Sequence, residues 1–396
     1  MNKIEFYKET NLKETVIGRV PKDWKVVSVY EILSLEYGKG LPEKERIIGE
    51  YPVVGSNGIV GYHNRSLVKG PGIVIGRKGT IGAVSWVEQD FWPIDTTYYV
   101  KLKKENVNWR WLYFALIKLN LPKLHLSDVV PGLKREIVYS LKVPFPPSIE
   151  EQRAIAEVLS VVDLAIQRTD MVIAKTERLK KGLMQTLLTR GIGHKEFKDT
   201  EIGKIPKTWQ IVSISDVCKQ RNEIVQPPVN NKEPLVGLEH IASGETRLRN
   251  YSQSADVKSA KFRFHRGDIL YGKLRPYLDK AVIADFDGIC STDLLVLTSK
   301  ENVLREFLIY VLHSNNFIKY AIATTRGTNH PRTSWSAISK FKFGLPERSE
   351  QQKIAEILSA ADMKIEFEKK EKVRLELIKQ GLMDLLLTGK VRVRVN

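Results

Sequence analysis

The sequence lacks most features that mark an enzyme with a metal site or a membrane protein. Its 396 residues contain two cysteines, Cys218 and Cys290, and neither has a second ligand at metal-binding spacing. The seven histidines form no HxxxH or HExxH pair, so a metal site is not predicted. The longest apolar stretch, near residues 111–117, is too short to cross a bilayer, and the polar start lacks the apolar segment of a signal peptide. We therefore expect a protein of a reducing, cytoplasmic compartment with no membrane partner.

Motifs for nucleotide, acyl or methyl transfer are also missing. Neither GxxxxGK[ST] nor G-x-S-x-G occurs. Both Pro-Pro segments, at 146–147 and 227–228, lack the preceding Asn or Asp of aminomethyltransferases. The triplet at 23–25 has the D-x-K form of some nucleases, but such triplets are common by chance. We expect this chain to have no catalytic residues and no cofactor of its own.

The sequence has fewer acidic residues than basic ones. Lys and Arg number 63 against 46 Asp and Glu, which gives a net charge of +17 and a pI near 9.6. Basic side chains displace the counterions condensed on phosphates, so this excess favours a nucleic acid as partner. A generically basic protein is the alternative interpretation.

The sequence contains an internal duplication. Residues 150–189 align without a gap with residues 349–388, and 17 of 40 positions are identical at an offset of 199. A second pair, IGRVPKDWKVVSV at 17–29 and IGKIPKTWQIVSI at 202–214, aligns at an offset of 185. The interiors between these matched ends barely align. This pattern predicts a tandem repeat of a globular block followed by a long helix.

The repeated segments carry apolar residues at spacings of three and four, as in a coiled-coil seam. Helices of about 40 residues would be about 60 Å long, and we expect them to pack antiparallel because a compact block separates them in the chain. A glycine recurs in each helix, at 182 and 381, and predicts a close backbone approach to the other helix or to a partner. One packed helix in each of two ordinary domains is the alternative. The residues predicted for helix packing or partner contact are Ile155, Val162, Leu179, Gly182, Leu183, Ile354, Leu358, Ile378, Gly381 and Leu382.

Both globular blocks have the pattern of mixed α/β domains with short strands. In each, a glycine-bounded strand (72–76 and 267–272) leads into a basic turn, and a second basic loop (131–135 and 326–332) comes near the end. Arg and Lys suit guanine, Asn suits adenine, and any single residue could instead be a solvated surface group. Trp24 and Trp209 occupy matching positions and are expected in the cores. The candidate DNA-contacting residues are Asn57, His63, Arg65, Arg77, Lys78, Lys134, Arg135, Arg247, Lys273, Arg275, Arg326, Asn329 and Arg332.

The chain resembles the specificity subunit of type I restriction–modification systems. The motif I-G-x-x-P-x-x-W occurs at Ile17 and Ile202, and E-Q-x-x-I-A-x-x-L-S-x-x-D begins at Glu151 and Glu350. Both helices also end in G-L-M-x-x-L-L-T. The resemblance implies an α+β fold with two α/β target-recognition domains separated by two long antiparallel helices that form a coiled-coil-like rod, a pseudo-twofold tandem repeat. The expected borders are 1–147 for the first recognition domain, 148–192 for the first long helix, 193–346 for the second recognition domain, and 347–396 for the second long helix and the C-terminal tail.

The resemblance also implies a mechanism. Each recognition domain would read one half of a split, asymmetric site in double-stranded DNA, and the helix pair would set the gap. The helices would dock two methylation subunits, and a restriction subunit would join them. S-adenosylmethionine, ATP and Mg²⁺ are expected on those partner subunits. The sequence leaves open an enzyme with an unrecognised site, a stand-alone DNA-binding regulator, a related system in which one polypeptide cuts and methylates, and a silent copy.

Overall fold

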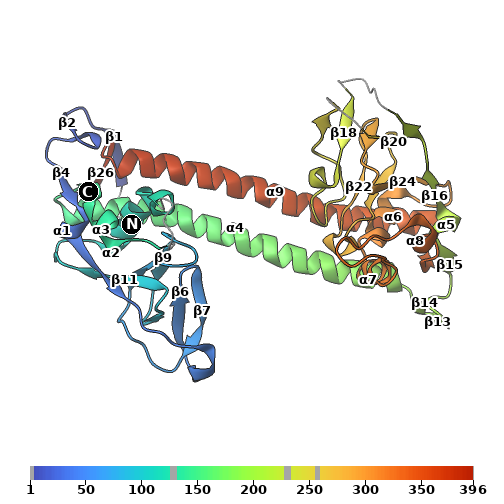
Figure 1. The fold of residues 1–396 in the computed structure, drawn as a ribbon, viewed down its shortest axis with the longest axis horizontal. Coiled ribbons are helices and arrows are strands. Elements are labelled where there is room, and N and C mark those ends of the chain that lie inside the picture. Colours follow the sequence, from blue (N-terminus) through green and yellow to red (C-terminus); the bar gives the residue numbers. More distant parts are fainter. Residues whose placement is uncertain (1–3, 125–131, 227–232, 255–258, 396) are drawn as a thin grey trace. The chain divides into compact units, whose positions relative to one another are not determined.

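The computed structural model describes residues 4–124, 132–226, 233–254 and 259–395. Contacts divide the chain into two units, residues 1–170 with 370–396 (unit 1) and residues 171–369 (unit 2). Two long helices, α4 (Ile149–Arg190) and α9 (Arg348–Leu386), each contribute one half to each unit (Figure 1). Within the described residues, no helix is long and apolar enough to span a membrane.

Unit 1 is a mixed α/β domain. Besides its helix halves it contains β1 (Ile4–Lys8), β2 (Leu12–Thr15), β3 (Gly18–Pro21), β4 (Lys25–Ser28), α1 (Val29–Ile32), β5 (Leu33–Tyr37), η1 (Glu43–Glu45), β6 (Tyr51–Gly55), β7 (Gly58–His63), β8 (Gly72–Gly76), β9 (Val84–Val87), β10 (Trp92–Pro93), β11 (Thr97–Leu102), α2 (Trp109–Lys118), η2 (Leu121–Leu124), α3 (Arg135–Ser140), β12 (Lys142–Phe145) and β26 (Val391–Val395).

Unit 2 repeats this plan with additions. It contains β13 (Phe197–Thr200), β14 (Gly203–Pro206), β15 (Gln210–Ser213), α5 (Ile214–Val217), β16 (Cys218–Arg221), β17 (Ile224–Val225), β18 (Pro234–Val236), η3 (Leu238–His240), β19 (Ser252–Gln253), β20 (Lys261–Phe264), β21 (Ile269–Gly272), η4 (Pro276–Leu278), β22 (Ala281–Ile283), β23 (Gly288–Cys290), β24 (Leu294–Ser299), α6 (Arg305–Leu312), α7 (Asn315–Ala323), α8 (Trp335–Ile338) and β25 (Lys342–Leu345).

The two units share one sheet topology. The antiparallel sheet β5-β11-β8-β9 of unit 1 has the same order as β16-β24-β21-β22 of unit 2. The paired strands β4 and β12 correspond to β15 and β25. A second sheet has order β10-β6-β7 in unit 1 but five strands, β17-β20-β23-β18-β19, in unit 2. The predicted α+β tandem repeat is therefore confirmed, and the copies differ most in this second sheet.

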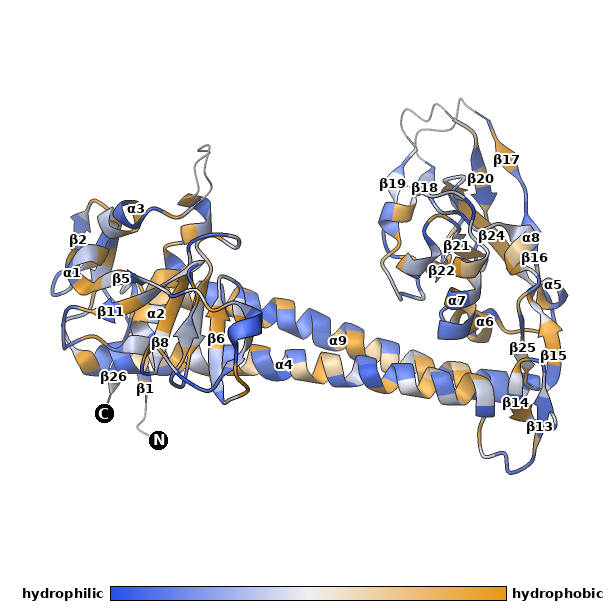
Figure 2. Cartoon of the chain, turned by 60° about the horizontal axis from the view of Figure 1, so that its bottom comes forward, coloured by the Kyte–Doolittle hydropathy of each residue, from blue (hydrophilic) through white to orange (hydrophobic). Residues whose placement is uncertain are grey.

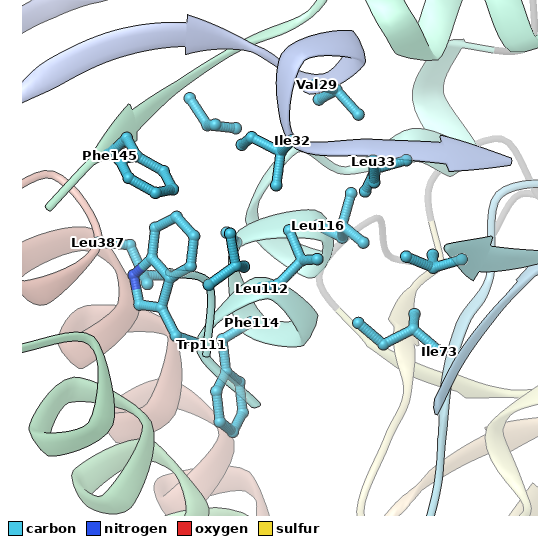
Figure 3. Packing of buried hydrophobic residues seen from close by; sticks show 14 of the residues in the cluster. Val29, Ile32, Leu33, Ile73, Trp111, Leu112, Phe114, Leu116, Phe145 and Leu387 are labelled. Atoms are coloured by element: carbon cyan, nitrogen blue, oxygen red, sulfur yellow. The ribbon is translucent and has the colours of Figure 1, made fainter. Parts of the chain in front are cut away.

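The core of unit 1 joins the globular domain to both helix halves. Trp111 and Phe145 meet edge to face with ring centroids 5.5 Å apart, and Leu387, just after α9, lies beside them (Figure 3). In unit 2, Ile354 and Leu358 of α9 belong to the same core cluster as Phe307 of α6. Trp24 and Trp209 are fully buried, which confirms their predicted core positions.

Ion pairs join the two helix halves in each unit and show that the halves run antiparallel. In unit 1, Lys379 lies 2.5 Å from Asp163 and Lys372 lies 2.7 Å from Asp170, so residue numbers fall in α9 as they rise in α4. In unit 2, Lys180 lies 2.5 Å from Asp362. Lys180 and Lys379 are repeat equivalents, and so are Asp362 and Asp163. The last residue of the E-Q-x-x-I-A-x-x-L-S-x-x-D motif thus pairs with a lysine of the other helix.

The first two residues of that motif attach each helix to its globular domain. Gln152 accepts a hydrogen bond from the Asn108 amide at 2.8 Å and donates to the carbonyl of Pro146 at 2.9 Å. Gln351 makes equivalent bonds to Leu304 and Pro346 at the same distances. The preceding carboxylates accept from tryptophan: Trp24 Nε1 donates to Glu151 at 3.2 Å, and Trp209 Nε1 donates to Glu350 at 2.9 Å.

Parts of the predicted helix seam were wrong. Ile155, Ile354 and Leu358 are buried, and Val162, Leu183 and Leu382 are partly buried, but Leu179 and Ile378 are 59% and 43% exposed. Each exposed residue precedes the lysine that pairs with an aspartate of the other helix. One step turns an α-helix by about 100°, so the preceding side chain points outward. Hydrophilic and hydrophobic residues alternate along both helices in Figure 2.

The expected close approach at the two glycines is not found within the described chain. A Cβ added at Gly182 or Gly381 would meet nothing within 4 Å. The helix-to-helix form of that prediction was therefore wrong, because neither glycine lies in the contact between the helices. The contact division falls inside α4 and α9, whereas the borders expected from the sequence follow the helix ends.

Candidate nucleic-acid interface

The turn after the central strand has the same backbone frame in both units. The Arg77 amide donates to Thr96 O at 2.9 Å, and its carbonyl accepts from the Leu133 amide at 3.0 Å. In unit 2 the Lys273 amide donates to Asp293 O, and its carbonyl accepts from the Thr333 amide, both at 3.0 Å. In each unit these bonds bring the two predicted basic loops together, although Arg77 and Leu133 are 56 positions apart in the chain and Lys273 and Thr333 are 60 apart.

In unit 1 the two loops meet over an aromatic ring. The guanidinium groups of Arg77 and Arg135 lie 5.2 and 4.7 Å from the centroid of the Tyr37 ring. Arg77 also donates to Asp95 O at 2.8 Å, while Lys78 and Lys134 are exposed beside them. Cation–π contacts hold the arginines in place. No sequence pattern pointed to Tyr37, which is 51% exposed.

Asn57 joins this group and two other candidates do not. Asn57 is exposed next to Ser56, whose hydroxyl accepts from the Thr80 amide of the basic turn at 3.4 Å. Arg65 is exposed beyond the opposite end of β7. His63 is buried, accepts a hydrogen bond from the Ile47 amide at 3.1 Å and meets Trp92 edge-on. The His63 ring is occupied inside the fold, so this structure gives it no surface from which to contact DNA.

In unit 2 the corresponding loops also form a basic surface. Arg326 and Arg332 exchange two backbone hydrogen bonds of 2.9 and 3.0 Å, and Asn329 is exposed on the loop between them. The Arg275 amide donates to Pro331 O at 2.8 Å, which fixes the two loops side by side. Arg332 also donates to Asp293 at 2.9 Å. Pro131, the first residue of the predicted unit 1 loop, lies outside the described residues.

Arg247 lies away from this surface. It is exposed and bridges through its backbone to Ile283, the last residue of β22. Its charge acts on the Tyr310 hydroxyl, which donates to Asp362 of α9 at 2.8 Å. Burial, followed by the Asp362 charge, raises the pKa of Tyr310 above its ordinary value, and Arg247 opposes that rise. Arg247 is therefore placed toward the helix pair of unit 2.

The part of the chain that the structure describes contains neither a cluster of metal ligands nor a reactive cysteine. No cluster of three or more His, Cys, Asp or Glu residues there could hold a metal ion. Cys218 and Cys290 are buried and unpaired, and burial raises the pKa of each thiol to about 12. Neither thiol is prepared for nucleophilic attack.

Comparison with known proteins places the chain in a family. The model for the type I restriction modification DNA specificity domain matches residues 21–176 and again residues 206–377. Both copies of the repeat are therefore matched separately, and together they account for most of the chain. The protein belongs to the type I restriction modification DNA specificity family.

Relatives are similar over nearly the whole chain. The type I restriction enzyme MjaVIII specificity subunit of Methanocaldococcus jannaschii is 28% identical over 438 residues, covering 99% of this chain and 98% of the relative. The EcoDI specificity subunit of Escherichia coli is 24% identical, covering 85% and 81%. The crystal structure of the type I S subunit from M. genitalium has a TM-score of 0.63 at 16% identity, covering 92% of this chain and 96% of that one. This structural likeness shows a shared fold.

Proposed function

We propose that this chain is the DNA-reading subunit of a type I restriction–modification complex and that it binds a split, asymmetric site in double-stranded DNA. One observation carries the proposal: each unit presents a pair of basic loops on the same backbone frame, anchored at Arg77 in unit 1 and Lys273 in unit 2. The frames are equivalent, but the side chains on them differ. Two related surfaces with different side chains suit two half-sites of different sequence.

The continuous helices would fix the gap between the half-sites. Half-sites on one face of the duplex lie about one turn, roughly 34 Å, apart. Removing whole helical turns from α4 and α9 together should shorten the gap and leave both half-site sequences unchanged. A change in the half-site sequences would contradict this role.

The chain would act without an active site of its own. Two methylation subunits would dock on the helices and supply S-adenosylmethionine, and a restriction subunit would supply ATP- and Mg²⁺-dependent cleavage in the cytoplasm. The exposed apolar residues Leu179 and Ile378, next to the open glycines Gly182 and Gly381, support docking on the helices.

Selection from random duplex DNA tests the proposal. The chain would be co-expressed with its methylation subunit, and bound or methylated DNA would be sequenced. We expect two short blocks around a fixed spacer. A single contiguous motif would instead indicate a stand-alone regulator, and methylation or cleavage by the purified chain alone would indicate an enzyme.

A further inference from the structure

The basic turns of the two units share a further feature, a pair of left-handed residues. In unit 1 the Gly76 amide donates to Ala83 O at 2.8 Å, and Gly79 and Gly82 have φ of 74° and 75°. In unit 2 the Gly272 amide donates to Lys280 O at 2.8 Å, and Arg275 and Asp279 have φ of 52° and 50°. Gly79 and Arg275 both come third after the last residue of the strand. Gly82 and Asp279 both precede the residue whose carbonyl closes the turn.

Unit 2 therefore keeps the two left-handed positions of unit 1 with side chains in place of the two glycines, although its turn from Gly272 to Lys280 is one residue longer than the turn from Gly76 to Ala83. Glycine adopts the left-handed conformation freely, whereas a Cβ disfavours it by crowding the carbonyl oxygen. Arginine is not among the residues that tolerate this region well. Such strained positions persist where the side chain contributes something that glycine would not.

The side chain of Asp279 has a contribution inside the fold. Its Oδ1 lies 2.7 Å from Nδ1 of His313, and the Nε2 of that ring lies 2.9 Å from Ala281 O. The His313 side chain is 2% exposed. Asp279 therefore satisfies a buried ring nitrogen, and its unfavourable backbone conformation has an internal explanation.

No interaction of the Arg275 side chain with the described residues accounts for the left-handed backbone at this position. Its backbone is held, because its amide donates to Pro331 O and its carbonyl accepts from the Leu278 amide at 2.9 Å. Its guanidinium has no hydrogen-bond or ion-pair partner in the described part of the chain, although the residue is half-buried. The adjacent Leu274 bridges through its backbone to Arg332, whose own guanidinium donates to Asp293 at 2.9 Å. A guanidinium without a partner on a firmly held backbone favours an acceptor supplied from outside the chain.

We propose that Arg275 reads a guanine in the half-site bound by unit 2. This rests on the proposed function. An arginine fork pairs with the O6 and N7 atoms of guanine in the major groove. Phosphate contacts are independent of sequence, so they need not differ between the two units, whereas base contacts must differ if the half-sites differ. The third residue after the strand changes from Gly79 to Arg275 while its backbone stays left-handed, as expected for a base reader.

The test is the same selection from random DNA, with full-length chain and methylation subunit. The variants are Arg275→Gly, which restores the residue of unit 1, and Arg275→Lys, which keeps the charge but loses the fork. The control is Arg266→Gly, because Arg266 is an exposed arginine before the opposite end of β21. We expect both Arg275 variants to lose preference for one G·C pair in one half-site by about 5- to 150-fold, the size of one good bidentate pair. The other half-site and the control should be unchanged.

Arg275→Gly removes strain, so its melting temperature should not fall, and lost discrimination cannot then be attributed to misfolding. An unchanged motif in both variants would overturn the inference. So would a uniform loss of affinity with an unchanged motif, which would indicate a phosphate contact. If the wild-type complex selects no split motif, the proposed function fails and the inference fails with it. A split motif in the wild type with unchanged variants overturns only the role of Arg275.

Discussion

Arg392 donates to both carboxylate oxygens of Glu151, at 2.8 and 2.9 Å, and so ties β26 to the first turn of α4. It also donates to Glu9 at 3.1 Å and to Asp23 at 2.9 Å. In unit 2, His194 lies 2.9 and 3.0 Å from the two oxygens of Glu350. Arg392 and His194 each come three residues after the glycine that follows a long helix. The same carboxylate position is thus paired with arginine in one unit and histidine in the other.

Replacing Arg392 should destabilise unit 1. Arg392→Met leaves the buried Glu151 carboxylate without its cation, and we expect a loss of about 3 kcal/mol in the free energy of unfolding. Urea denaturation of the wild type and the variant measures it. The control is Arg394→Met on the same strand, which removes only an exposed side chain 4.9 Å from the Tyr7 ring and should cost less than about 1 kcal/mol. Equal effects would refute the special role of Arg392.

The lysine–aspartate pairs between the helices should be worth more than the surface pair beside them. Lys379→Met leaves the largely buried Asp163 with only Arg110, at 3.9 Å, and Lys180→Met leaves Asp362 with only the Tyr310 hydroxyl among its close partners. We expect each variant to cost about 2–4 kcal/mol. Lys369 and Glu177 are both more than half exposed at 3.6 Å, so Lys369→Met should cost under about 0.5 kcal/mol. Double-mutant cycles with Asp163→Asn and Asp362→Asn measure the coupling. A coupling near zero would show that these pairs do not hold the helices together.

The two helix glycines should tolerate alanine. Because nothing lies within 4 Å of an added Cβ at Gly182 or Gly381, each alanine should stabilise the isolated chain by about 0.5–1 kcal/mol through helix propensity. Thermal unfolding measures this, and pull-down with the methylation subunit measures assembly. Greater stability with weaker assembly is expected if the partner's backbone approaches there. A stability loss in the isolated chain would contradict the open environment seen here.

Acid should weaken both units through their capping boxes. The Ser28 amide and hydroxyl lower the pKa of Glu31, and the Ser213 hydroxyl and amide lower the pKa of Asp216. A carboxyl whose pKa is depressed by folding stabilises the fold above its unfolded pKa, and this contribution is lost as pH falls through the folded pKa. We therefore expect the free energy of unfolding to decrease as the pH falls below 4.5, the ordinary pKa of a glutamate side chain. Urea unfolding between about pH 3 and 7 should show a shallower fall for Glu31→Gln. The exposed Glu157→Gln serves as control, and an equal slope in all three chains would reject the idea.

The repeat made the long helices, their direction and the buried tryptophans predictable from the sequence. The apolar periodicity wrongly placed Leu179 and Ile378 in the contact between the helices. The lysine that follows each of them occupies that contact instead, paired with an aspartate of the other helix. The basic loops were visible individually, but their pairing depends on backbone hydrogen bonds between distant residues such as Lys273 and Thr333. The left-handed backbone at Arg275 leaves no mark in composition. Aligning Gly76 with Gly272 could have revealed it, because Gly79 then falls opposite Arg275.

The antiparallel pairing of β1 with β26, from Ile4 opposite Val395 to Lys8 opposite Val391, has a consequence for how unit 1 can open locally. Where unit 2 has the continuous segment from Gly191 to Phe197, unit 1 has two strands that are distant in sequence and joined through backbone pairing. These strands can separate without any break in the chain, and the segment after α9 would then come away from β1. Unit 2 has no equivalent route of local opening at this place.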